Sequence, residues 1–138
     1  LTLAVGFESS GLALWIGGKL EALQVLPFIV LLLILIAIVN FLTEITSNIA
    51  TTAILLPVLV SLAPVLGVHP YYLMIAATLA ASCAFMLPVA TPPNAVVFGS
   101  GYLEMGDMVK KGFWLNIISI IILTAVVYLV LPLVWDLS

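Results

Sequence analysis

The chain has 138 residues, of which 65% are hydrophobic and only 7% are charged. A soluble domain would carry roughly 25% charged residues to cover its surface, so lipid must surround most of this chain's exterior. Six acidic side chains and three lysines, with no arginine, give a net charge of −3 and exclude a nucleic-acid or phosphate-binding surface. The single cysteine, Cys83, excludes an internal disulfide and a cysteine-based metal cluster.

The N-terminal residues 1–24 predict the end of a membrane helix followed by an amphipathic arm helix at the membrane interface. Leu1–Phe7 is apolar but too short to span a bilayer. In Ser10–Leu23 apolar residues recur near helical spacing with polar residues among them, as in a helix that lies in the interface plane. Trp15 suits the level of the lipid headgroups.

Residues 25–68 predict a re-entrant helical hairpin. Two apolar runs, Phe28–Val39 and Ala53–Leu66, are each shorter than the about 20 residues that a spanning helix needs. No charged loop separates them, and the polar cluster between them contains Asn40, Thr43, Glu44, Thr46, Ser47, Asn48, Thr51 and Thr52. Irregular backbone at that depth must be buried in protein or line a water-filled cavity. Two short helices that meet at a polar tip make such a re-entrant hairpin, with the irregular backbone confined to the tip.

Residues 69–104 predict a broken transmembrane helix. Leu73–Leu87 is apolar and rich in the small residues that allow close helix packing, and Ala95–Leu103 resumes the helical pattern. Between them, Pro88–Asn94 holds three prolines, which remove three amide donors and disfavour helical geometry in the residues before them. We therefore expect the break at Pro88–Asn94.

Residues 105–138 predict a cytoplasmic loop followed by the final transmembrane helix. Glu104–Gly112 is the most polar stretch of the chain and is expected to be a loop. Lys110 and Lys111 favour the cytoplasmic side for it. The apolar run Phe113–Val134 is long enough to span the membrane, which puts the C-terminus outside.

Two polar breaks, Thr43–Thr52 and Pro88–Asn94, therefore interrupt apolar sequence. Unpaired backbone groups inside a membrane are costly, so such breaks persist when the exposed groups bind something. Helix N-termini favour an anion, and free carbonyls and hydroxyls favour a hard cation such as sodium. A purely structural alternative stays open, in which hydroxyls bond back to carbonyls and prolines only kink helices. Neutral hydrogen-bonding side chains available to a site are Ser47, Asn48, Thr91 and Asn94.

Glu44 is the only acid deep in apolar sequence, and two roles are open for it. It is either a coupling-ion or proton group, or a buried acid paired with a neighbouring hydroxyl or backbone amide. Enzyme activity is not expected, because His69 and Cys83 are single copies without a partner that would activate a nucleophile. Gly99–Gly101 lacks the context of a nucleophile elbow, and no metal-ligand spacing is present.

Two motifs resemble one known family, the divalent anion/sodium symporters, which transport dicarboxylates, citrate and, in some members, sulfate. The run Thr43–Thr52, which reads TEITSNIATT, resembles the family's second Ser-Asn-Thr hairpin, and Leu-Leu-Pro follows at Leu55–Pro57. The run Ala90–Ala95, which reads ATPPNA, resembles the unwound segment of the family's penultimate helix, with Phe98–Gly101 after it. The resemblance runs along nearly the whole chain and covers the family's C-terminal repeat.

The resemblance implies an all-α integral membrane fold, forming one inverted repeat of a dimeric, elevator-type transporter in the plasma (inner) membrane. It implies sodium as the coupling ion, a di- or tricarboxylate anion as substrate, and the N-terminal half of the transporter as partner. Because the sequence starts at Leu1 within apolar residues and holds about three spanning elements, we expect one half or a fragment of a larger protein. A sodium-independent anion exchanger and a non-transporting structural membrane subunit stay open as alternatives.

The resemblance also assigns roles to particular residues. Those expected to bind or line the substrate are Ser47, Asn48, Ile49, Thr91 and Pro92. Those expected to hold a sodium ion are Thr43 and Asn48, the carbonyls of Thr46 and Ala90, and the neighbouring Asn94. The third residue of the hairpin motif is commonly Thr in the family and is Ile49 here, which removes a hydroxyl from the pocket.

Overall fold

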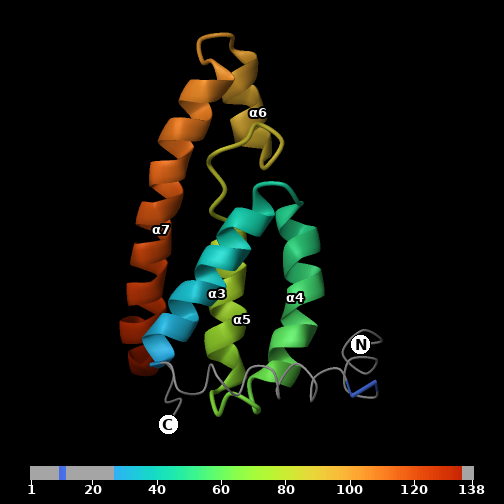
Figure 1. The fold of residues 1–138 in the computed structure, drawn as a ribbon, viewed down its shortest axis with the longest axis vertical. Coiled ribbons are helices and arrows are strands. Elements are labelled where there is room, and N and C mark those ends of the chain that lie inside the picture. Colours follow the sequence, from blue (N-terminus) through green and yellow to red (C-terminus); the bar gives the residue numbers. More distant parts are fainter. Residues whose placement is uncertain (1–9, 12–26, 135–138) are drawn as a thin grey trace.

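The computed structural model describes residues 10–11 and 27–134, which form helices and connecting segments without a β-strand. The amphipathic arm helix predicted within residues 1–24 lies outside the described residues, apart from Ser10 and Gly11. The helices in the described part, shown in Figure 1, are α3 (Phe28–Thr43), α4 (Asn48–Leu62), α5 (Pro70–Ala81), α6 (Pro92–Gly99) and α7 (Met105–Val134). The all-helical class predicted from the sequence is thereby confirmed.

Helices α3 and α4 form a hairpin whose arms meet at one end and diverge from it (Figure 1). Their lengths of 16 and 15 residues correspond to about 24 Å and about 22 Å, below the roughly 30 Å of a bilayer core. Helix α3 continues past the apolar run Phe28–Val39 into the polar cluster and ends at Thr43. Helix α4 begins at Asn48, ahead of the apolar run Ala53–Leu66. Only residues 44–47 connect them.

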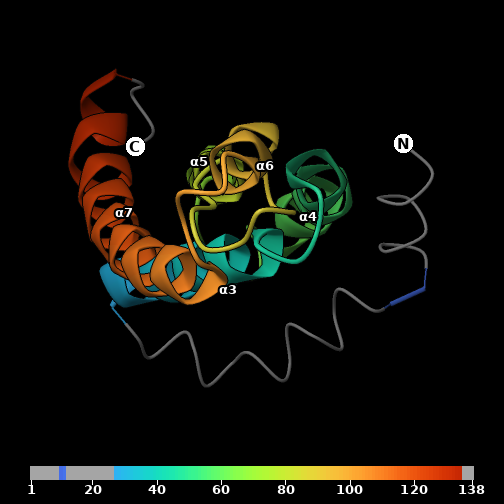
Figure 2. The same ribbon diagram turned by 90° about the horizontal axis from the view of Figure 1, so that it is seen from above.

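Helix α5 packs against α3, α4 and α7, and fills the space between the diverging arms of the hairpin (Figures 1 and 2). The side that it presents to them is made of small buried residues, Ala76, Ala77, Ala80 and Ala81, which let helix backbones approach closely. The larger core residues around them are Leu32, Ile36, Val39, Leu59, Leu73, Ile120, Val127 and Leu131. The core therefore lies where three helices surround α5.

The break after α5 lies earlier than the sequence predicted. Helix α5 ends at Ala81 rather than Leu87, and α6 begins at Pro92 rather than Ala95, so the break is Ser82–Thr91 and not Pro88–Asn94. Pro92 and Pro93 occupy the first turn of α6, where a helix leaves its amides unpaired in any case. Thr91 caps this turn by accepting a hydrogen bond from the Asn94 amide at 3.4 Å.

The stretch Glu104–Gly112, expected to be a loop, is helical from Met105 onward and forms the start of α7. The backbone amides of Asp107 and Met108 donate to the Glu104 carbonyl. Asp107 lies in the first turn, where the helix dipole stabilises a negative charge. With 30 residues, α7 is the one described helix long and apolar enough to cross a membrane. One buried stripe runs along it at helical spacing: Met108, Gly112, Asn116, Ile120, Thr124, Val127 and Leu131.

Candidate functional site

The N-terminus of α4 forms the tip of the hairpin and is open. Ser47 is the N-cap residue, but its side chain accepts no hydrogen bond from the first backbone amides of α4. Ser47 is exposed, and Ile49 is 82% exposed. A shallow groove beside the tip is lined by Asn48, Ile49, Thr52, Ala53, Leu56 and Ser82. Uncapped amides and the partial positive charge of a helix start make this tip suited to a carboxylate.

Below the tip, three oxygen atoms from three different elements converge. The hydroxyl of Thr43, a fully buried residue at the end of α3, lies 2.6 Å from Asn48 Oδ1 and 3.0 Å from the Ala81 carbonyl oxygen. One hydroxyl proton serves these two acceptors, so at any moment one of them lacks a full hydrogen bond. Neutral oxygens gathered in this way are the ligands that hard cations prefer.

Only two of the five residues expected to hold sodium, Thr43 and Asn48, hydrogen-bond each other in the described part of the chain. The Thr46 hydroxyl instead lies 2.8 Å from the Leu42 carbonyl and 2.6 Å from the Thr51 hydroxyl. Among the described residues, no group of three or more His, Cys, Asp or Glu side chains that would suit a transition metal occurs.

The other expected residues lie at the end of the break or in the first turn of α6. Asn94 donates through Nδ2 to the carbonyls of Ala84 at 2.9 Å and Leu87 at 3.1 Å, so it ties the start of α6 to the unwound segment. Ala90 is buried, and its amide donates to Leu87 at 3.1 Å. Thr91 is the cap of α6, and Pro92 is exposed in its first turn.

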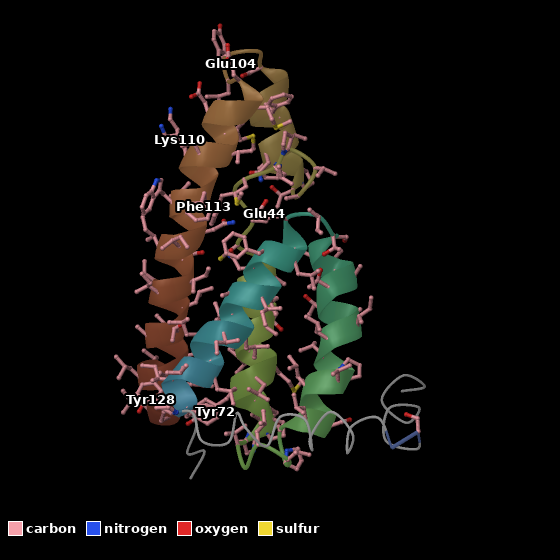
Figure 3. All side chains as sticks on the ribbon, viewed as in Figure 1. Glu44, Tyr72, Glu104, Lys110, Phe113 and Tyr128 are labelled. Atoms are coloured by element: carbon pink, nitrogen blue, oxygen red, sulfur yellow. The ribbon has the colours of Figure 1, made fainter. Side chains whose placement is uncertain are left out.

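Glu44, the residue after Thr43, organises the unwound segment. Its carboxylate is 3% exposed and accepts the consecutive amides of Phe85 at 2.7 Å, Met86 at 2.9 Å and Leu87 at 3.1 Å. Asn116 on α7 donates a fourth hydrogen bond at 2.7 Å. Figure 3 shows Glu44 at the end of α3, between α7 and the segment that follows α5. Of its two open roles, the pairing with backbone amides is the one that the structure contains.

Three residues of this region were missed by the sequence analysis as contributors. Asn40 donates to the Cys83 carbonyl at 2.5 Å and lies 3.4 Å from the Ser119 hydroxyl, while Asn116 binds Glu44. Gly112 allows α7 to approach the break, because a Cβ there would lie 2.6 Å from Met86 Cα. An amide side chain inside an apolar helix is the signal that would have found both asparagines, since such residues face the interior of a bundle.

Comparison with known proteins identifies similar sequences along nearly the whole chain. The sequence model of the family described as "Sodium:sulfate symporter transmembrane region" matches residues 1–135. The chain is 47% identical over 132 residues to "Sodium-dependent dicarboxylate transporter SdcS" of Staphylococcus saprophyticus, an alignment that covers 96% of this chain and 25% of that relative. It is 49% identical over 134 residues to the protein of the same name in Staphylococcus aureus strain USA300, covering 97% of this chain and 26% of the relative.

An apolar all-helical chain with polar groups gathered where its helices are interrupted has the features of an integral membrane protein. Within that class, the chain belongs to the sodium:sulfate symporter family, as the match over residues 1–135 shows. The resemblance carried by Thr43–Thr52 and Ala90–Ala95 is therefore confirmed. So is the exclusion of an enzyme, because this family consists of transporters. The chain spans about a quarter of the length of the relatives it matches, which are 25% and 26% covered.

Proposed function

We propose that this chain lies in the C-terminal half of a sodium-coupled transporter of di- or tricarboxylate anions in the plasma membrane. The observation that carries the proposal is the contact of Thr43 with Asn48 and Ala81, directly below the open N-terminus of α4. A cluster of neutral oxygens next to a helix start offers one place for a cation and one for an anion. The relatives' sodium and dicarboxylate specificity supports this assignment.

The substrate carboxylate binds at the tip of the hairpin. Ser47 and the backbone amides at the start of α4, that of Asn48 among them, donate to it. Ile49 presents an apolar wall where a threonine would add a donor, and the groove beside it holds the remaining length of the anion. Thr91 and Pro92 at the start of α6 complete the pocket from the broken helix.

Sodium binds between Thr43, Asn48 and the end of α5. The Thr43 hydroxyl, Asn48 Oδ1 and the Ala81 carbonyl supply oxygen ligands, and the carbonyls of Thr46 and Ala90 complete the set, with Asn94 supporting that backbone. Asn48 belongs to both sites, since its side chain faces the cation and its amide opens the helix that faces the anion. A bound cation therefore orients the residue that binds the substrate, and its charge attracts the carboxylate, which couples the two ligands.

The arms of the hairpin are shorter than a bilayer core, which supports a re-entrant arrangement with the tip inside the membrane. The units of this half are the hairpin at residues 25–68, the broken helix at 69–104 and the final segment at 105–138. Lys110 and Lys111 favour the cytoplasmic side for the start of α7, which would put the C-terminus outside. The N-terminal half supplies the inverted counterpart, and two copies form a dimer that works by an elevator mechanism.

The proposal is tested with the full-length parent protein in proteoliposomes. Uptake of labelled succinate and citrate is measured with an inward sodium gradient and, in parallel, with a potassium gradient of equal size. We expect uptake with sodium only. Equal uptake under both gradients would refute sodium coupling and favour an exchanger. Correctly inserted protein with no uptake of either anion under any gradient, including counterflow, would favour a structural subunit.

A further inference from the structure

We propose that Glu44 is a positioning residue, which frees the Ala81 carbonyl for the cation site by drawing away the amide that would otherwise bond it. This inference rests on the proposed function, because it deepens the sodium site described above. Glu44 itself touches neither ligand. Its action runs through the backbone of residues 83–87 and is completed by α7.

The local sequence does not explain why α5 ends at Ala81. Residues 82–87 contain no proline, and all six are apolar or small residues that a helix accommodates, while Pro88 disfavours helix chiefly in the residue directly before it. In a continuous helix the amide of Phe85 would donate to Ala81, four residues before it, and the amide of Leu87 would donate to Cys83. Both of these amides donate to the Glu44 carboxylate instead. The helix is therefore interrupted by a carboxylate 41 residues earlier in the chain than Phe85.

The carbonyls released by this exchange take new partners. The Ala81 carbonyl lies 3.0 Å from the Thr43 hydroxyl, inside the cluster assigned to sodium, and the Cys83 carbonyl accepts from Asn40 at 2.5 Å. Thr43 and Glu44 are adjacent at the end of α3, so one helix end supplies a cation ligand and also sets the position of a second one. Without Glu44, the Phe85 amide would be available to donate a helical hydrogen bond to the Ala81 carbonyl, and that carbonyl would then no longer be available to the cation.

Helix α7 holds this arrangement from the other side. Asn116 donates to the same carboxylate oxygen that accepts Phe85 and Met86, which fixes the Glu44 side chain. One turn earlier, Gly112 lies against Phe85 and Met86 so closely that a side chain would not fit. Four donors satisfy the oxygens of this buried side chain, as a buried polar group requires. The carboxylate is thus used by the protein's own backbone and is not a ligand of the transported ions.

The test uses the full-length protein with Cys83 as its only cysteine, any others being replaced by serine. Glu44→Gln keeps the size of the side chain but turns an amide group toward backbone donors, and Asn116→Ala removes the fourth donor while leaving Glu44. Glu104→Gln, the same change at an exposed position, is the matched control. Two quantities are measured: the sodium concentration for half-maximal succinate uptake, and the rate at which a maleimide modifies Cys83 with and without sodium.

In Glu44→Gln we expect the half-maximal sodium concentration to rise about tenfold, because a hydrogen bond to a charged group is lost, with a smaller change in the KM for succinate. The rate at which the maleimide modifies Cys83 should also change in this variant, and adding sodium should no longer alter that rate. Asn116→Ala should shift both quantities in the same direction by less, and Glu104→Gln should shift neither.

The proposal is overturned if Glu44→Gln keeps the wild-type sodium curve and Cys83 rate. A weakened sodium response with an unchanged Cys83 rate also overturns it, since Glu44 would then act as a direct ligand. If Glu44→Gln does not fold, Asn116→Ala decides in the same way. If the wild-type protein takes up no anion with sodium, the proposed function fails, while a Cys83 rate altered by Glu44→Gln would still support the backbone role.

Discussion

The contact of Gly112 with the unwound segment leads to a prediction whose size follows from the structure. An alanine Cβ at this position would lie 2.6 Å from Met86 Cα and closer still to the Phe85 carbonyl oxygen. An ordinary contact begins at 3.4 Å, so α7 would have to move about 0.8 Å to clear Met86 Cα and further to clear the Phe85 carbonyl oxygen. Because all these neighbours are backbone atoms, no side chain can rotate away to make room.

We expect Gly112→Ala to lower the free energy of unfolding by about 1–3 kcal/mol, the usual cost of overpacking a tight contact. The matched control is Gly106→Ala on the same helix, where an added Cβ meets nothing within 4 Å. There the substitution should be neutral or stabilising by up to about 1 kcal/mol, because alanine favours a helix more than glycine does.

The assay is thermal unfolding of the purified full-length protein in detergent, followed by intrinsic fluorescence with and without sodium. Gly112→Ala should show a lower Tm than wild type and a smaller gain of Tm on adding sodium, because the displaced segment carries the carbonyls next to the cation site. Gly106→Ala should keep both values. Equal Tm values for the two alanine variants would refute the close approach of α7 to Met86.

Three further substitutions test the site itself. Thr43→Val keeps the shape of the side chain but removes the hydroxyl, so the sodium concentration for half-maximal uptake should rise about tenfold, whereas Thr43→Ser should stay near wild type; identical sodium curves for Val and Ser would exclude the hydroxyl as a ligand. Asn48→Ala should abolish both sodium-dependent uptake and sodium-dependent substrate binding, and retention of either one would separate the two sites that Asn48 is proposed to join. Ile49→Thr adds a donor beside the groove, so the KM for succinate should fall about threefold with the sodium curve unchanged, and an unchanged KM would place Ile49 outside the pocket.

The existence of the hairpin and of the break could be predicted from sequence, because both depend on local patterns. The two apolar runs on either side of Thr43–Thr52 are too short to span a bilayer, and the prolines of Pro88–Pro93 cannot all lie inside one helix. The motifs around Asn48 and Thr91 also identified the family. These signals lie within a few residues of the features that they predict.

The boundaries of the break could not be predicted, because contacts between distant residues set them. Residues 82–87 are compatible with helix, and they unwind because Glu44 and Asn40 on α3 bind their amides and carbonyls. The predicted start of the final helix was wrong for a different reason. The charges around Lys110 and Lys111 suggested a loop, whereas lysine is a good helix former and both lysines lie exposed on the first turns of α7.

The central claim is that one chain segment joins a cation and a carboxylate through Asn48, and simultaneous flux measurement tests it most directly. Influx of labelled sodium and labelled succinate is recorded in the same proteoliposomes, for the full-length wild type and for Asn48→Ala. We predict that sodium influx rises with external succinate in the wild type and that both fluxes disappear in the variant. Sodium influx that is indifferent to succinate, or succinate influx that persists in Asn48→Ala, would contradict the account.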